Sequence, residues 1–292
     1  MGNTLAILAD PWWLGLTTAL FGLIVGSFLN VVIHRVPIML ERQWKRDCRE
    51  YLELPAEAPA PEHYNLLTPA STCPHCGHAI RWYENIPVLG WLALRGKCAS
   101  CHAPIGLMYP LIELITALLS VVTALHFGPT PLGLAALGLT WALIALAVID
   151  LRTTLLPDNI TLPLLWAGLL ASLWLGHIPL ADAVIGAMAG YLSLWSVYQL
   201  FRLLTGKEGM GFGDFKLLAA LGAWLGWAQL PGIILISSIV GALVGIALIL
   251  FRRTERGTPI PFGPYLAAAG WIALIWGEPI KAWYLGLLNG PF

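Results

Sequence analysis

Two aspartates, Asp150 and Asp214, lie at the ends of long apolar runs. A charged side chain near the hydrocarbon of a bilayer costs roughly 2.5–3.5 kcal/mol on insertion scales, so each is a candidate functional residue. Asp150 ends one apolar run, and Asp214 stands in residues 209–216 (GMGFGDFK), directly before another. Two carboxyl groups that share one proton can hydrolyse a peptide: one acts as base on water while the other, protonated, polarises the scissile carbonyl. The pair therefore predicts an aspartic protease site.

Glycines at three alternate positions precede this second carboxylate, namely Gly209, Gly211 and Gly213. They leave the backbone permissive, so that a substrate strand or a facing helix can approach closely. A structural interpretation stands beside the catalytic one: Asp214 caps the next helix, and Asp150 is an interfacial residue neutralised by Arg152. Spacing alone does not separate these two interpretations.

Two further acids are candidates for a supporting role. Asp158 follows Pro157, which fixes a turn, and either Asp158 or Asn159 can cap the next helix. We assign Asp158 a structural or site-supporting role rather than catalysis. Glu113 is an acid within another apolar run. It can contact a substrate's charged end or the polar network of the site, or it can be an ordinary interfacial residue.

Four cysteines form two Cys-x-x-Cys pairs separated by twenty-one residues: Cys73, Cys76, Cys98 and Cys101. This spacing is close to that of a four-thiolate zinc site, and closed coordination predicts a structural ion that staples a small segment. A redox pair is the alternative. His75, His78 or His102 could replace a thiolate, although the cysteine set is complete without them. Cys48 is left as an ordinary thiol.

Composition places these residues in a membrane protein. Hydrophobic residues make up 58% of the 292 and charged residues only 11%, against about 25% charged in a soluble domain. The net charge of zero gives no indication of nucleic-acid binding. With ~20 residues per span, we expect an all-α protein of about eight transmembrane helices. They are residues 12–33, 109–127, 132–149, 160–175, 180–203, 215–230, 232–251 and 262–276.

The predicted organisation has three parts. Residues 1–33 hold the first transmembrane helix, 34–108 a cytoplasmic domain with the zinc site, and 109–292 a seven-helix protease domain. Within the second part, the charged and Pro/Ala-rich stretch 41–69 is expected to be an irregular loop or a short amphipathic helix. With the amino terminus outside, every Lys and Arg except Lys281 falls on one side of the membrane. This positive-inside pattern puts both aspartates and the cysteines on the cytoplasmic side.

These features together resemble the type IV prepilin leader peptidase family over nearly the whole chain. The matching stretches are GSFLNVVIHRVP (26–37), the two cysteine pairs with NIP (85–87) and LRGKC (94–98), YPLIE (109–113), Asp150 with LPD (156–158), GDFK (213–216) and PFGPY (261–265). The family also resembles presenilin-type proteases in its Gly-x-Gly-Asp motif. The resemblance implies eight helices and a cytoplasmic-side catalytic pair at Asp150 and Asp214.

The resemblance also implies substrates, cofactors and location. Family members cut type IV prepilins and type II secretion pseudopilins after a glycine, in the bacterial inner membrane. Many then methylate the new amino terminus with S-adenosylmethionine, an activity associated with the insert and with Gly96 and Lys97 here. No Gly-x-Gly-x-x-Gly fingerprint supports a methyl-donor site independently.

Two other functions remain open on the residues alone. Paired intramembrane acids also suit a proton-coupled transporter. Transporter acids tend to sit near the midplane on broken helices, whereas these flank helix ends on one face. A zinc-knuckle scaffold that recruits partners would explain the insert but would leave the acids without a role.

Overall fold

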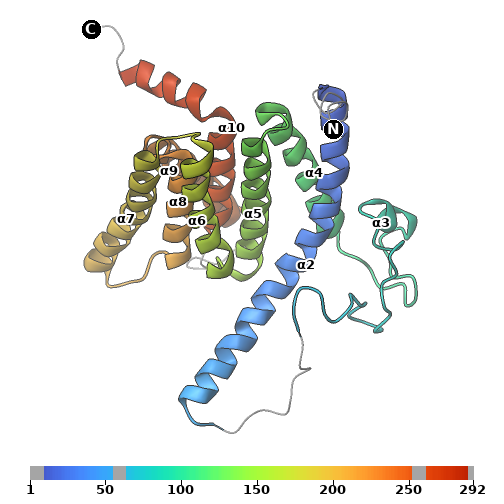
Figure 1. The fold of residues 1–292 in the computed structure, drawn as a ribbon. Coiled ribbons are helices and arrows are strands. Elements are labelled where there is room, and N and C mark those ends of the chain that lie inside the picture. Colours follow the sequence, from blue (N-terminus) through green and yellow to red (C-terminus); the bar gives the residue numbers. More distant parts are fainter. Residues whose placement is uncertain (1–9, 55–63, 252–260, 289–292) are drawn as a thin grey trace. The chain divides into compact units, whose positions relative to one another are not determined.

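The computed structural model describes residues 10–54, 64–251 and 261–288, and nearly all of the described chain outside 64–107 is helical (Figure 1). It divides into two compact units, Met1–Pro129 and Thr130–Phe292. The first holds α2 (Pro11–Tyr51), α3 (Leu89–Ala93) and α4 (Met108–Phe127). The second holds α5 (Pro131–Thr153), α6 (Asp158–Leu175), α7 (Leu180–Thr205), α8 (Phe212–Leu225), the 3₁₀ turn η1 (Trp227–Gln229), α9 (Leu230–Leu250) and α10 (Gly263–Leu288).

Six helical stretches within the described residues are long and apolar enough to cross a bilayer: α2, α4, α5, α6, α7 and the stretch 227–250, which is η1 with α9. The all-α, multi-pass prediction is therefore confirmed. The number eight stays a prediction. α8 has 14 residues, fewer than the ~20 that a bilayer-spanning helix needs.

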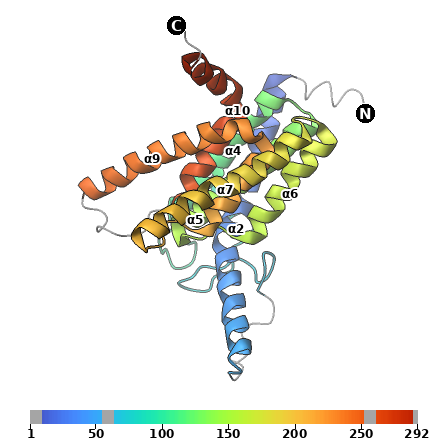
Figure 2. The same ribbon diagram turned by 90° about the vertical axis from the view of Figure 1, so that its left-hand side faces the viewer.

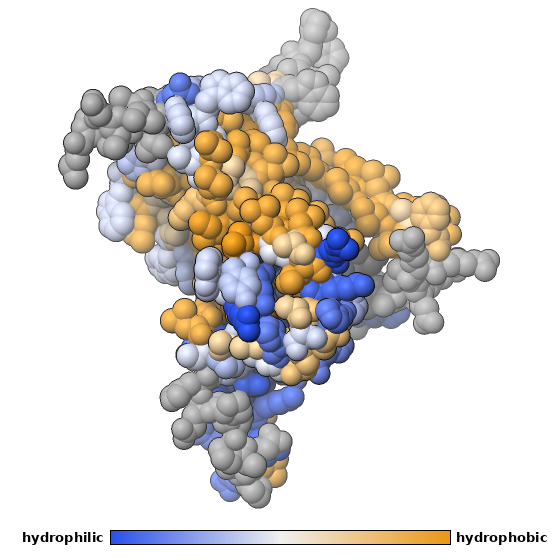
Figure 3. Space-filling view, turned by 90° about the vertical axis from the view of Figure 1, so that its right-hand side faces the viewer, coloured by the Kyte–Doolittle hydropathy of each residue, from blue (hydrophilic) through white to orange (hydrophobic). Residues whose placement is uncertain are grey.

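The first unit is built on close packing of α2 against α4. A Cβ added at Gly22 would lie 2.8 Å from the Ala117 Cα, and one at Gly26 would lie 2.7 Å from the Glu113 Cα. Glycines four residues apart thus let two membrane helices approach at backbone distance. In Figure 3, apolar residues cover the middle of the visible face and hydrophilic residues gather below them.

α2 is longer than the sequence predicts. It continues past Ile33 and through Pro37 to Tyr51, into the stretch for which a loop or a short amphipathic helix is expected. Beyond the apolar run, side-chain pairs support the helix, as the 2.7 Å contact between Lys45 Nζ and Glu41 Oε1 shows. The buried Arg35 holds the chain that returns from this extension, because its guanidinium donates to two backbone carbonyls at 2.8 and 2.6 Å.

In the second unit, α8 packs against α6, α7 and α10 (Figures 1 and 2). Its sequence is apolar almost all round, which is typical of a buried helix, and Phe215, Leu217, Leu218 and Leu221 have no exposed surface. Gly190 of α7 allows the close approach, since a Cβ there would lie 2.5 Å from the Leu218 carbonyl oxygen. α8 ends at Leu225 rather than at the predicted residue 230, because Gly226 (φ 79°) turns the chain into η1.

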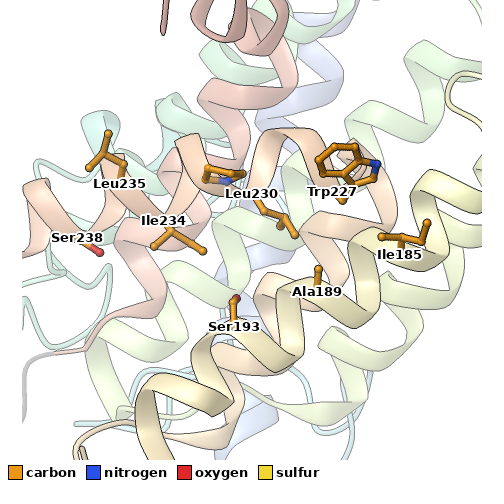
Figure 4. A pocket seen from close by; sticks show the side chains of 9 residues that line it. Ile185, Ala189, Ser193, Trp227, Leu230, Ile234, Leu235 and Ser238 are labelled. Carbon is orange, nitrogen blue, oxygen red and sulfur yellow. The ribbon is translucent and has the colours of Figure 1, made fainter. Parts of the chain in front are cut away.

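A pocket of about 560 Å³ lies between α7, η1 and α9 (Figure 4). Its walls are almost wholly apolar, with Ile185 and Ala189 on one side and Leu230, Ile234 and Leu235 on the other. Neither Asp150 nor Asp214 lines it. The helix ends that carry the two aspartates therefore lie outside this pocket.

Candidate active site and candidate metal centre

Asp150 lies in the last turn of α5 and is only 5% exposed. Its Oδ2 accepts a hydrogen bond from the backbone N–H of Gly263 at 2.9 Å. Gly263 is the first residue of α10, where backbone N–H groups have no partner within the helix. The carboxylate is therefore enclosed by protein and held by another helix.

Asp214 is the third residue of α8 and is 7% exposed. The helix is capped by Gly211 and has no side-chain cap, so the N-cap interpretation of Asp214 is wrong. Within the described residues, its Oδ1 is buried and has no hydrogen-bond partner. The carboxyl groups of Asp214 and Asp150 interact electrostatically. The structure thus brings the two predicted acids together inside the second unit.

Leu156 connects the surroundings of the two acids. It lies in the turn between α5 and α6, and its side chain contacts Gly213, the residue before Asp214. The same side chain contacts Gly263, the donor to Asp150. Residues from three separate segments therefore enclose the carboxyl pair. The sequence singles out Gly213 as a position of close approach, but Leu156 and Gly263 stand only within motifs of the family, because no local pattern shows that these residues touch.

Asp158 does not cap α6. Pro157 is the N-cap residue, and there is no side-chain cap hydrogen bond. Both carboxylate oxygens of Asp158 instead lie 2.7 Å from Nζ of Lys216, two residues after Asp214 in α8. Asp158 is the first residue of α6 and not its N-cap, so its carboxylate is free to pair with this ammonium group. The expected supporting role thus takes the form of a tie between the start of α6 and the first turns of α8.

A pair of buried carboxyl groups, one with a backbone donor and one with an unpartnered oxygen, can hold a water and share a proton. Two ionised carboxylates close enough to interact would repel, and a buried polar atom without a partner is costly unless a ligand or water satisfies it. The geometry fits general acid–base hydrolysis. The carboxyl pair also differs from a salt bridge, because no basic side chain among the described residues forms an ion pair with either acid.

The four predicted cysteines form one cluster, with their sulfur atoms all within 4.8 Å of one another. Cys73 and Cys101 Sγ are 3.8 Å apart, and Cys76 and Cys98 Sγ are 3.9 Å apart. A tetrahedral ion with metal–sulfur bonds of 2.3 Å has sulfur–sulfur edges of about 3.8 Å. Two of the six sulfur–sulfur distances thus match such an ion, and the four thiols are close enough to hold a metal.

The two cysteine turns have the same backbone hydrogen bonds. Cys73 N–H donates to His78 O and Gly77 N–H to Cys73 O; in the second turn, Cys98 N–H donates to Ala103 O and His102 N–H to Cys98 O. Gly77 and His102 occupy equivalent positions, with φ of 71° and 57°. His102 is thus a turn residue. His78 is engaged elsewhere, since its Nε2 lies 3.2 Å from Glu84 Oε2.

Gly96 and Lys97 lie at the start of the second cysteine turn. Gly96 has φ 67°, and its missing Cβ leaves room for the ring of Trp91, whose indole N–H donates to the Ile105 carbonyl at 3.1 Å. Lys97 pairs with Pro104 in an isolated bridge, and its side chain is exposed. Both residues therefore shape the turn that carries Cys98. Their expected contact with a methyl donor stays a prediction.

Glu113 is buried in the first unit and does not belong to the carboxyl pair. Its Oε2 accepts from the backbone N–H of Val88 at 2.8 Å, and Ser27 also hydrogen-bonds to this carboxylate. Val88 has φ 60°, a rare conformation for a β-branched residue. Glu113 thus joins the two membrane helices of this unit to the insert. Its contact with a substrate or with the polar network of the site stays a prediction.

The fold and the site define a multi-pass helical membrane protein with a buried aspartate pair and a four-cysteine cluster. Residues 20–127 match the model of the bacterial peptidase A24 N-terminal domain, and residues 137–246 match the type IV leader peptidase family. The chain belongs to the type IV leader peptidase family.

Relatives that match nearly the whole chain carry the same name, prepilin leader peptidase/N-methyltransferase. The protein of Aeromonas hydrophila is 61% identical over 275 residues, covering 94% of this chain and 95% of the relative. That of Pseudomonas aeruginosa is 59% identical over 270 residues, covering 92% and 93%. That of Burkholderia pseudomallei is 51% identical over 280 residues, covering 95% and 91%. No solved structure matches. These names support the peptidase interpretation and not the transporter.

Proposed function

We propose that this chain is a membrane-embedded aspartic endopeptidase that cleaves type IV prepilins and type II secretion pseudopilins after a glycine. Asp150 and Asp214 are its catalytic pair. Family membership and the names of the relatives support the reaction class. The observation that carries the assignment is the buried pair itself: Asp150 is held by the Gly263 N–H, while Asp214 has an unpartnered Oδ1.

The pair works as one unit that holds a single proton. One carboxylate takes a proton from the attacking water, while the protonated partner donates a hydrogen bond and then a proton to the scissile carbonyl oxygen. The tetrahedral intermediate collapses as the leaving amine takes up a proton. The Gly263 N–H keeps the Asp150 carboxylate oriented through these steps, which is a form of preorganisation.

Membrane depth explains the substrate class. The leader of a prepilin is polar and its following segment is apolar, so the bond between them falls at the membrane surface. Both aspartates flank apolar helices rather than lying at their centres. We place this protein in the bacterial inner membrane, with the pair and the cysteine cluster on the cytoplasmic side, since the distribution of Lys and Arg supports that orientation.

The cysteine cluster binds a structural Zn²⁺ in this proposal. Cys73, Cys76, Cys98 and Cys101 supply all four positions of a tetrahedral ion, which leaves none for water. A zinc ion held there would cross-link the insert and would take no part in peptide cleavage. The sulfur–sulfur distances of 3.8 and 3.9 Å support this assignment.

The second activity is N-methylation of the new amino terminus with S-adenosylmethionine as donor. The relatives' names include this activity, and nearly the whole of each chain is shared. Gly96 and Lys97 are the residues that the family resemblance offers for the donor. Their position beside Cys98 makes methylation depend on the folded insert.

The test is mass spectrometry of a prepilin co-expressed with the enzyme, which reports cleavage and methylation together. Asp150→Asn and Asp214→Asn should each abolish cleavage, with loss of at least about 10³-fold in rate for a general acid–base pair. Both variants should remain in the membrane at normal level. Near-normal processing by either variant would rule out the pair.

A further inference from the structure

Leu156 is wedged between glycines from two different helices. A Cβ added at Gly213, in the first turn of α8, would lie 2.7 Å from the Cβ of Leu156 and 3.3 and 3.4 Å from its Cδ1 and Cγ. All three nearest atoms belong to this one side chain. Real Cβ atoms do not approach other atoms this closely, so Gly213 is needed because Leu156 is there.

Gly263 is restricted by two neighbours. A Cβ there would lie 2.7 Å from Asp150 Oδ2 and 3.1 Å from each methyl group of Leu156. The absence of a side chain is what lets its N–H reach Asp150 at 2.9 Å. Any side chain at 263 would push the carboxylate or the start of α10 away.

We propose that Leu156 and Gly263 are positioning residues for the aspartate pair. Leu156 sets the distance between the first turn of α8, which carries Asp214, and the start of α10. Gly263 then orients the Asp150 carboxylate through its backbone N–H. The inference rests on the proposed function, because it concerns the same two acids. Each residue acts through the placement of an aspartate, and a misplacement of about 1 Å can cost about 10²-fold in rate.

A side chain added at Gly213 and one added at Gly263 would conflict with different neighbours, and this difference can be tested. Gly213→Ala conflicts with Leu156 alone, and the closest atom is the Leu156 Cβ, so Leu156→Gly should relieve the conflict. Gly263→Ala conflicts with Leu156 and also with Asp150, so Leu156→Gly should leave the second conflict in place. Gly138→Ala is the matched control, since it adds a methyl group to the helix that carries Asp150 at a position with no atom within 4 Å.

The experiment measures kcat and KM for cleavage of a purified prepilin by the full-length enzyme in detergent, with the thermal midpoint of each variant. We expect Gly213→Ala to lower kcat on the order of 10²-fold with little change in KM. Adding Leu156→Gly should restore kcat to within about threefold of the Leu156→Gly single variant. Gly263→Ala should stay on the order of 10²-fold low in both backgrounds. Gly138→Ala should cleave normally.

Rescue of both glycine variants by Leu156→Gly, or of neither, would overturn the inference. So would normal kcat in Gly213→Ala. A folding defect cannot imitate the expected result, because it would lower the thermal midpoint and the amount of active enzyme rather than respond to Leu156→Gly at one glycine only. If Asp150→Asn and Asp214→Asn abolish cleavage but no coupling is found, the inference fails and the proposed function stands. If those two variants cleave, both fail.

Discussion

The Gly263 backbone N–H lies 2.9 Å from Asp150 Oδ2, although 113 residues of chain separate them. This hydrogen bond joins the end of α5 to the start of α10 and leaves Asp150 with a fixed donor. Asp214 has an Oδ1 without a partner among the described residues. The two acids of the pair are therefore held differently, and substitutions at the two positions should have different effects on stability.

Asp150→Ala should unfold more easily than Asp150→Asn, although both are inactive. The amide oxygen of Asn can still accept from Gly263, whereas Ala leaves a buried N–H unpaired, at a cost of about 1–3 kcal/mol. The measurement is the thermal midpoint in detergent. The corresponding Ala and Asn variants of Asp214 serve as control, and their midpoints should differ less. Equal differences at the two sites would mean that the Gly263 hydrogen bond contributes nothing.

The ion pair between Asp158 and Lys216 should couple the first turn of α6 to α8. Partly exposed pairs contribute up to about 1 kcal/mol, so Asp158→Asn or Lys216→Met should each lower the thermal midpoint slightly, and the double variant should be no worse than either alone. High salt should weaken the effect. Glu41→Gln is the control: it removes the exposed ion pair with Lys45 on α2, which has the same 2.7 Å length, and it should leave cleavage unchanged. Additive losses in the double variant would contradict the coupling.

The two cysteine turns should respond oppositely to matched substitutions. Gly77→Ala places a side chain at φ 71°, at a cost of about 1 kcal/mol, and should weaken zinc binding about fivefold to tenfold. His102→Gly relieves a left-handed non-glycine residue and should keep zinc affinity or raise it. Competition with a chromophoric chelator measures both affinities on the full-length protein. A large loss of zinc in His102→Gly would instead make His102 a ligand.

Removing a cysteine should destabilise the insert more than it alters the aspartate pair. Cys73→Ser or Cys98→Ser breaks the four-thiolate set, so the purified protein should contain less than one zinc per chain by elemental analysis. Methylation of the prepilin should fall more than the rate of its cleavage. Wild-type protein without zinc would contradict the structural site, and equal loss of both activities would contradict the separation of roles.

Glu113 should stabilise the first unit because its side-chain oxygen accepts a hydrogen bond from the Val88 N–H, whether or not the side chain is charged. Glu113→Gln keeps an oxygen for the Val88 N–H, while Glu113→Ala leaves that N–H unpaired and the φ 60° backbone of Val88 unsupported. We expect Glu113→Ala to cost about 1–3 kcal/mol more than Glu113→Gln, measured by proteolysis of the insert in membranes. If Gln is as damaging as Ala, the carboxylate charge itself is required.

Helix positions and candidate acids were predictable from local features. Apolar runs predict membrane helices by length, and an acid at the end of such a run is conspicuous because burying its charge is costly. The cysteine cluster was also predictable, since each turn closes through hydrogen bonds within six residues of chain, from Cys73 to His78 and from Cys98 to Ala103.

The sequence by itself thus determined the helical membrane class, the four thiols and the two acids. Only the tertiary structure decided that Asp150 bonds to Gly263, that Asp158 pairs with Lys216 rather than capping α6, and that Leu156 needs glycine at 213 and 263. It also decided that α2 runs on to Tyr51. The physical reason is distance along the chain: a contact between helices depends on how their side chains pack in space, and no local pattern of residue types encodes that packing.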